Sequence, residues 1–203
     1  MKIIKQLEAN ISEIIEALKQ GKVIVYPTET CYGLGCDATN AGAVKKLFAI
    51  KHREKNKPVL VLMADVEMSK KYVQWSPMLD ELTRKYWPGP LTVVVKIIDK
   101  KNDLARGVVG EDQTVAFRVT AHPFAHDLVV KLGRPLVSTS ANITAQASPY
   151  DIQKVLQMFE NTINQPDIII DSGSLPYHSP STIVRIVDDK IEVLRQGELV
   201  LNL

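Results

Sequence analysis

The chain has 203 residues, of which 45% are hydrophobic and 24% are charged, and its formal net charge at pH 7 is +2. This size and composition predict one soluble globular domain over residues 1–203, which needs no disulfide or structural metal to stay folded. The near balance of charge argues against a histone-like nucleic-acid binder. Because the sequence has no signal peptide and no apolar run of roughly 20 residues, we expect a cytoplasmic protein that makes no membrane contact.

The first half of the sequence alternates between helical and strand patterns. Ile11, Ile14 and Leu18 recur at helical spacing, and Gly21 ends that helix. Residues 23–26 form a β-branched run closed by Pro27, which indicates a buried strand. The hydroxyls and glycines of residues 28–35 are typical of a loop. Further along, the patterns predict a helix at 41–51, a strand at 59–63, a helix at 77–87 and a strand at 91–98.

The second half continues this mixture without a strict βαβ rhythm. Residues 100–110 read as a polar turn region, and Asp188 with Asp189 marks a hairpin turn. The patterns predict helices at 122–132, ended by Gly133, and at 151–159, with strands at 114–119, 136–138, 167–170, 182–187 and 191–195. We therefore expect one α/β (α+β) domain, built on a twisted mixed sheet of parallel and antiparallel strands flanked by helices.

Several common catalytic and nucleotide-binding motifs are missing. There is no P-loop. The run from Gly33 to Ala38 is similar to a dinucleotide-binding motif, but the basic residues Lys51 and Arg53 stand where that motif has an acidic residue that binds ribose. His122 and His126 lie four residues apart without the glutamate of a zinc-protease motif, so we expect ordinary helix histidines and no protein metal site. Cys31 and Cys36 lack zinc-knuckle spacing and suit small buried thiols. No G-x-S-x-G elbow marks a hydrolase.

Four polar loops each follow a predicted strand or helix: 26–35, 51–58, 138–142 and 179–182. Hydroxyls, amides and bare backbone at strand ends suit a phosphorylated, zwitterionic substrate. The basic loop has two readings, because its four lysines and arginines within seven residues could simply complement the C-terminal end of a helix dipole. The same cations could instead bind a triphosphate and neutralise charge as pyrophosphate leaves.

These motifs, taken together and in order, resemble the YrdC/Sua5 family in its short, YrdC-type form. The resemblance is carried by YPTET (26–30) with YGLG (32–35), the K-x-R of Lys51 and Arg53, the S-x-N of Ser140 and Asn142, PSTI (180–183) and RQG (195–197). It implies an L-threonylcarbamoyladenylate synthase, which turns L-threonine, bicarbonate and ATP into threonylcarbamoyl-AMP and pyrophosphate for t6A modification of tRNA. It also implies a large concave, positively charged cavity.

The resemblance gives roles to individual residues. Thr28, Arg118, Ser138 and Ser181 would bind threonine or its carbamoyl group, with Arg118 on the threonine carboxylate. Lys51 and Arg53 would meet the ATP phosphates as electrostatic catalysts. Mg²⁺ would be carried by the phosphates rather than by protein ligands. Ser140, Asn142 and Arg195 would contact the nucleotide. The product would pass to the tRNA threonylcarbamoyl transferase machinery.

Two rival functions stay open at this point. An RNA-binding protein could use the same basic concave surface, and its RNA affinity would fall steeply with salt. A YrdC-like paralogue could share the fold and act on another acceptor, in which case turnover would not depend on threonine.

Overall fold

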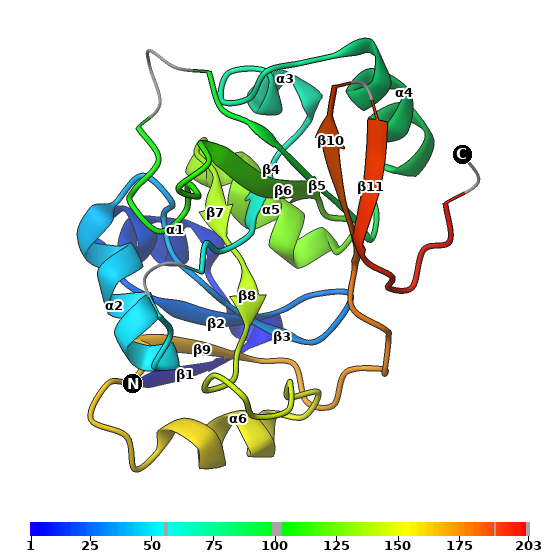
Figure 1. The fold of residues 1–203 in the computed structure, drawn as a ribbon. Helices are drawn as coiled ribbons and strands as arrows, with labels where there is room; N and C mark the ends of the chain where they lie inside the picture. The colour runs from blue at the N-terminus through cyan, green and yellow to red at the C-terminus, as the bar shows by residue number, and fades with distance from the viewer. Residues whose placement is uncertain (55–56, 99–102, 189, 202–203) are drawn as a thin grey trace.

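The computed structural model describes residues 1–54, 57–98, 103–188 and 190–201, and its strands form two mixed sheets (Figure 1). The five-stranded sheet, called sheet A here, has the order β1 (Lys2–Lys5), β9 (Ile168–Asp171), β2 (Ile24–Pro27), β3 (Tyr32–Gly35) and β8 (Thr139–Ser140). Strand β9 runs parallel to both β1 and β2, whereas β3 is antiparallel to β2 and β8.

Sheet B has six strands in the order β11 (Lys190–Arg195), β10 (Thr182–Val187), β5 (Leu91–Lys96), β6 (Thr114–Val119), β4 (Val61–Met63) and β7 (Leu136–Val137). The pairs β10–β5 and β4–β6 are parallel, and the other three pairs are antiparallel. The predicted α/β domain with mixed strand directions is therefore confirmed. Its strands divide between two sheets, and the chain passes from sheet B at β7 to sheet A at β8, with Ser138 at the crossing.

The helices are the short η1 (Gln6–Glu8), α1 (Ile11–Lys19), α2 (Ala41–Lys51), α3 (Val66–Ser69), α4 (Pro77–Tyr86), α5 (Pro123–Leu132) and α6 (Ile152–Phe159). Side-chain acceptors cap the first turns of the predicted helices, as Asn40 does by accepting from Ala43 N of α2. At the other end of α5, Gly133 takes a φ of +68°, as the sequence predicts for a helix stop. None of the helices in the described ranges combines the length and apolar character needed to cross a membrane.

Two apolar clusters hold the elements together. The larger one joins α2, α4 and α6 to the inner faces of both sheets, around residues such as Leu47, Phe117 and Phe159. In the smaller cluster, α1 packs on α5, and this helix pair covers Tyr26 of β2 and Leu62 of β4. The two sheets are thus fixed relative to each other by cores on both sides of their junction.

Strand β3 corrects the expectation of a loop over residues 28–35. Only residues 28–31 form a turn, and Tyr32 to Gly35 pair along β2 with both large side chains fully buried. Gly33 and Gly35 have no side chains that would show the strand period in the sequence. The structure nevertheless requires glycine in this strand, because neighbouring atoms leave no room for a Cβ. A Cβ on Gly35 would lie 2.3 Å from Val137 O and 2.8 Å from the Tyr26 ring.

Other differences are short elements and shifted ends. The sequence patterns missed β1, η1, α3 and β8, which are too short to show a clear period. Helix 41–51 and strands 114–119 and 182–187 have the predicted bounds, and the remaining elements differ by one to two residues at an end. Part of the 100–110 turn and Asp189 of the predicted hairpin turn lie outside the described residues.

Candidate active site

A small cavity of about 130 Å³ lies where the two sheets meet, and it is called the inter-sheet cavity here. Drug-sized ligand sites measure roughly 300–1,000 Å³, so this space suits a ligand of amino-acid size. Its walls are rich in hydroxyls and come from both sheets and from the segments that cross between them. The lining residues are Thr28, Thr30, Cys31, Gly33, Leu60, Arg118, Ser138, Thr139, Ser140, Ser148, Tyr150, Pro180 and Ser181. Five of the predicted site residues are therefore brought together.

Arg118 is the positively charged residue of this cavity. It lies on β6, where the period of two sends Val115, Phe117 and Val119 into the larger core and turns Arg118 to the opposite face. The residue is only 3% exposed, and its Nε and Nη1 atoms are buried without a hydrogen-bond partner. Nη1 is 3.0 Å from Glu29 Oε1, a distance that makes an ion pair without the angles of a hydrogen bond. The guanidinium therefore lines the cavity as a buried cation that is ion-paired with Glu29.

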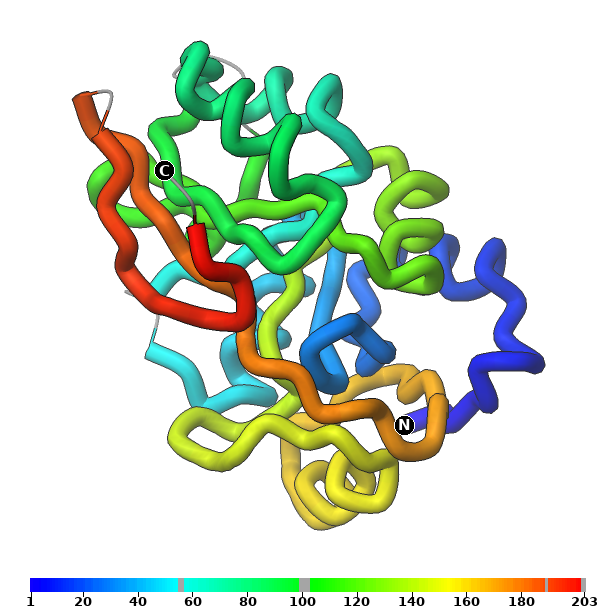
Figure 2. Tube along the Cα trace, turned by 90° about the vertical axis from the view of Figure 1, so that its right-hand side faces the viewer, coloured from blue at the N-terminus to red at the C-terminus, as the bar shows by residue number. Residues whose placement is uncertain are grey.

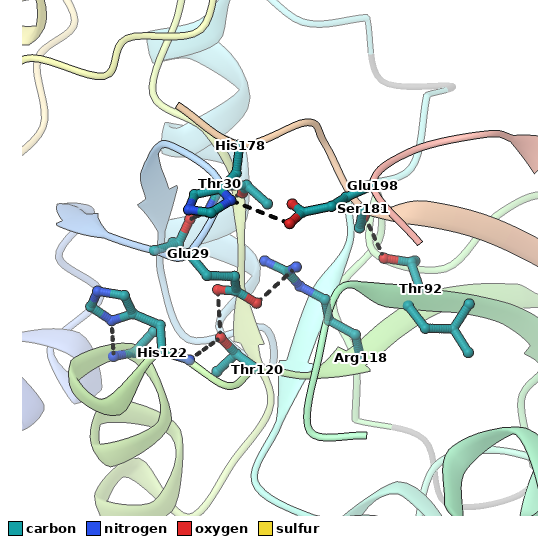
Figure 3. Close-up of polar contacts among 12 residues, drawn as sticks. Glu29, Thr30, Thr92, Arg118, Thr120, His122, His178, Ser181 and Glu198 are labelled. Atoms are coloured by element: carbon teal, nitrogen blue, oxygen red, sulfur yellow. Dashed lines mark hydrogen bonds and ion pairs between the residues drawn. The ribbon is translucent and has the colours of Figure 1, made fainter. Parts of the chain in front are cut away.

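The hydroxyl-bearing residues around Arg118 are positioned by hydrogen bonds of their side chains or their backbone. Thr28 ends β2 in a tight turn, where its Oγ1 donates to Cys31 O at 2.7 Å and accepts from Thr30 N at 3.2 Å. Ser138 occupies the crossing between the sheets, and its N donates to Leu60 O. Ser181 precedes β10, and its Oγ is 2.9 Å from Thr92 Oγ1 (Figure 3).

Lys51 joins the predicted K-x-R and S-x-N motifs. It is the last residue of α2 and is 2% exposed. Its Nζ donates to Ser140 O at 2.5 Å, Asn142 O at 2.7 Å and Asn142 Oδ1 at 3.3 Å. Burial, followed by the charge of Arg53, lowers the pKa of Lys51 from 10.5 to about 8. Ser140 also lines the inter-sheet cavity, so Lys51 and its hydrogen-bond partners adjoin that cavity.

Arg53 and Arg195 make their hydrogen bonds away from Lys51. Arg53 folds back on its own loop, where Nε donates to Lys57 O at 2.8 Å and Nη2 to Pro58 O at 3.0 Å. It lines a separate outer cavity of about 680 Å³ on the exposed side of α2 and does not line the inter-sheet cavity. Lys55 of the same basic loop lies outside the described residues. Arg195, at the end of β11, donates from Nε and Nη2 to Ser181 O at 3.1 and 2.8 Å.

A model of the Sua5/YciO/YrdC family, which carries the description "Telomere recombination", matches residues 16–197. The chain belongs to this Sua5/YciO/YrdC family. The family resemblance found in the sequence is thereby confirmed. Lys51 and the residues that line the inter-sheet cavity all lie within the matched range.

Two bacterial relatives of this Sua5/YciO/YrdC domain match it over nearly its whole length. The threonylcarbamoyl-AMP synthase of Vibrio vulnificus strain YJ016 is 35% identical over 193 residues, which cover 93% of this chain and 99% of the relative. The protein of the same name from Vibrio cholerae strain Classical Ogawa 395 is 36% identical over 194 residues, with 94% and 99% covered.

Solved structures give the same family and fold. P. abyssi Sua5 complexed with L-threonine superposes with a TM-score of 0.83 at 31% identity over 97% of this chain. E. coli YciO superposes with a TM-score of 0.81 at 26% identity, covering 97% of this chain and 94% of YciO. The chain covers only 56% of the length of that Sua5 chain, and 60% of the length of a P. abyssi Sua5 variant with two alanine substitutions.

Some residues of the site gave no signal in the sequence reading. Thr30 and Glu29 belong to a quoted motif but received no role, and Ser148 and Tyr150 come from a connection without a pattern. Tyr32 N donates to Pro149 O, a long-range contact that places this connection against the cavity. Only the tertiary structure reveals these neighbours.

Within the described residues, no group of three or more His, Cys, Asp or Glu side chains is placed to hold a metal ion. His122 instead caps α5, with its Nδ1 accepting from Ala125 N, and His126 Nε2 lies 3.0 Å from Ala64 O. Cys31 and Cys36 are buried free thiols, as the sequence predicts, and burial raises the pKa of both.

Proposed function

We propose that this chain is a threonylcarbamoyl-AMP synthase. It would convert L-threonine, bicarbonate and ATP into threonylcarbamoyl-AMP, pyrophosphate and water, for the t6A modification of tRNA. The observation that carries the proposal is Arg118, a buried guanidinium that lines an amino-acid-sized cavity among hydroxyl side chains. The relatives named threonylcarbamoyl-AMP synthase and the Sua5 structure with L-threonine support it.

The inter-sheet cavity matches the chemistry of threonine. A guanidinium presents its donors as a planar fork, which fits a carboxylate better than an ammonium does. Thr28, Ser138 and Ser181 surround Arg118 with hydroxyls that can donate to or accept from the threonine side chain and the carbamoyl group. Each hydroxyl is anchored at a strand end, so the ligand would meet a rigid set of polar groups.

ATP would approach from the side of Lys51, Ser140 and Asn142. Lys51 connects the end of α2 to the backbone of residues 140 and 142, and Ser140 faces the amino-acid cavity. The nucleotide phosphates would lie beside the S-x-N motif and be stabilised by the nearby charge of Lys51, with Arg53 and Arg195 contributing further positive charge. Mg²⁺ would come with the phosphates as part of the substrate, because the described residues offer no carboxylate cluster for it.

This arrangement needs no side-chain nucleophile. The threonine nitrogen would join the bicarbonate carbon to form a carbamate with loss of water, and the carbamate oxygen would then attack the α-phosphate as pyrophosphate leaves. Carbamates are unstable in water, so a small cavity that holds both reactants together would make the main contribution. The remaining contribution would be stabilisation of the charge that develops on the phosphates.

The test is pyrophosphate release from ATP by the purified protein, with L-threonine or bicarbonate omitted in turn. The proposal predicts release only when both are present. Release that is indifferent to threonine would contradict it and favour a paralogue that acts on another acceptor. A folded protein that releases no pyrophosphate, and that binds RNA with a steep salt dependence, would favour the RNA-binding alternative.

A further inference from the structure

We propose that Glu29 is a specificity-determining residue, which makes the Arg118 site selective for a zwitterion over a simple anion. The inference rests on the proposed function and adds a residue to its amino-acid site. Glu29 is the carboxylate that contacts Arg118, with Oε1 and Nη1 3.0 Å apart (Figure 3). Glu29 is therefore already the counter-ion of the buried guanidinium before any ligand arrives.

Glu29 is held in this position by a hydrogen bond to its other carboxylate oxygen, the one that does not contact Arg118. Its Oε2 accepts a hydrogen bond of 2.7 Å from Thr120 Oγ1, and Thr120 is only 1% exposed. The same Thr120 oxygen accepts from His122 N at 3.2 Å, which ties it to the start of α5. Because the far oxygen is fixed by a buried hydroxyl, the near oxygen, Oε1, stays beside Arg118. That oxygen is buried and has no hydrogen-bond partner.

The charges around Arg118 explain the selectivity. The ion pair sums to zero, so a ligand of zero net charge leaves the buried site neutral. An amino acid meets this condition because its ammonium balances its carboxylate. A ligand with only a carboxylate would leave one uncompensated negative charge in a buried place, which is costly.

The same site without Glu29 would favour any anion. Arg195 lies close enough to Arg118 that their mutual repulsion, after burial, contributes to lowering the pKa of Arg195. Two guanidinium groups around Ser181 would then attract phosphate, bicarbonate and small carboxylic acids alike. Glu29 offsets the charge of the buried Arg118, whereas water screens the charge of Arg195, whose side chain is exposed. The segment 172–181 leads from β9 of sheet A to β10 of sheet B (Figure 2).

The experiment compares binding of L-threonine with binding of (R)-3-hydroxybutanoate, which lacks the α-amino group, by calorimetry at pH 7. The wild type should prefer L-threonine by about tenfold or more, since the analogue brings an unbalanced charge. Glu29→Gln keeps the size and an acceptor for Thr120, and it should reduce this preference by about tenfold. Glu198→Gln is the matched control: it removes a nearby carboxylate that contacts His178 rather than Arg118, and it should leave the preference unchanged.

The outcomes separate the two claims. A wild type that does not bind L-threonine would overturn the proposed function itself. A wild type that binds L-threonine while Glu29→Gln weakens both ligands equally, or neither, would overturn only the role of Glu29, because a purely structural counter-ion has that effect. If Glu29→Gln does not fold, the wild-type comparison still decides: equal affinity for the two ligands would refute the zwitterion selectivity.

Discussion

Replacing Lys51 by methionine tests whether the Lys51 ammonium is a buried charge that destabilises the folded protein. The Lys51 ammonium is buried at the end of α2 and donates to the carbonyls of Ser140 and Asn142. A pKa lowered from 10.5 to about 8 corresponds to about 3 kcal/mol, because each unit is worth about 1.4 kcal/mol. Since burial is the largest cause, this is the cost that folding bears to keep the charge inside the protein.

The sign of the pH dependence follows from this shift. Below about pH 8, Lys51 is protonated in both the folded and the unfolded chain, and the full cost is present. Between about 8 and 10.5 the unfolded chain keeps its proton while the folded chain releases it, so the free energy of unfolding rises with pH. Above 10.5 both forms are neutral and the gain, about 3 kcal/mol, is complete.

The assay is urea unfolding of the wild type and of Lys51→Met at several pH values from 7.5 to about 10.5. Taking the difference between the two proteins cancels other titrating groups, and the wild type should gain about 3 kcal/mol relative to the variant over this window. Lys45→Met, at an exposed position of α2, should give a difference that does not change with pH. A flat difference for Lys51→Met as well would refute the buried, destabilised ammonium.

The remaining predictions concern the anion site, the flanking arginine and the fold. Arg118→Lys should raise the KM for L-threonine by about tenfold or more, because an ammonium lacks the planar fork; an unchanged KM would remove Arg118 from the carboxylate site. Arg53→Ala should raise the KM for ATP in steady-state assays without changing the calorimetric affinity for L-threonine, because Arg53 does not line the inter-sheet cavity. Gly35→Ala should destabilise the protein by about 3 kcal/mol in urea unfolding, since its Cβ would lie 2.3 Å from Val137 O. Gly42→Ala, in α2, should be neutral or stabilising, and equal losses for both variants would contradict the close approach at Gly35.

Long periodic elements could be predicted from the sequence because their burial patterns are local. Helix Ala41–Lys51 and strand Thr114–Val119 have their predicted bounds. The alternation in Thr114–Val119 also places Arg118 on the face opposite Phe117, so the functional residue follows from the same pattern as the core. Strand Tyr32–Gly35 could not be predicted in this way, because its glycines remove the side chains that carry the signal.

The grouping of the site residues depends on contacts between distant parts of the chain. Lys51 reaches Ser140 and Asn142 from another element. The family resemblance assigned all three to the nucleotide but did not predict this direct contact. Glu29 gave no such signal, because its partners Arg118 and Thr120 are distant in the sequence. The outward placement of Arg53 also depends on how its loop folds back on Lys57 O.

The most direct test of the proposed function is to identify the product made from ATP, L-threonine and ¹³C-labelled bicarbonate by mass spectrometry. A threonylcarbamoyl-AMP synthase should make one compound that contains threonine, AMP and a single ¹³C atom in the carbonyl between them. Its formation should require the Arg118 guanidinium at the inter-sheet cavity. Threonyl-AMP without the label, or hydrolysis of ATP without any threonine-containing nucleotide, would contradict the account.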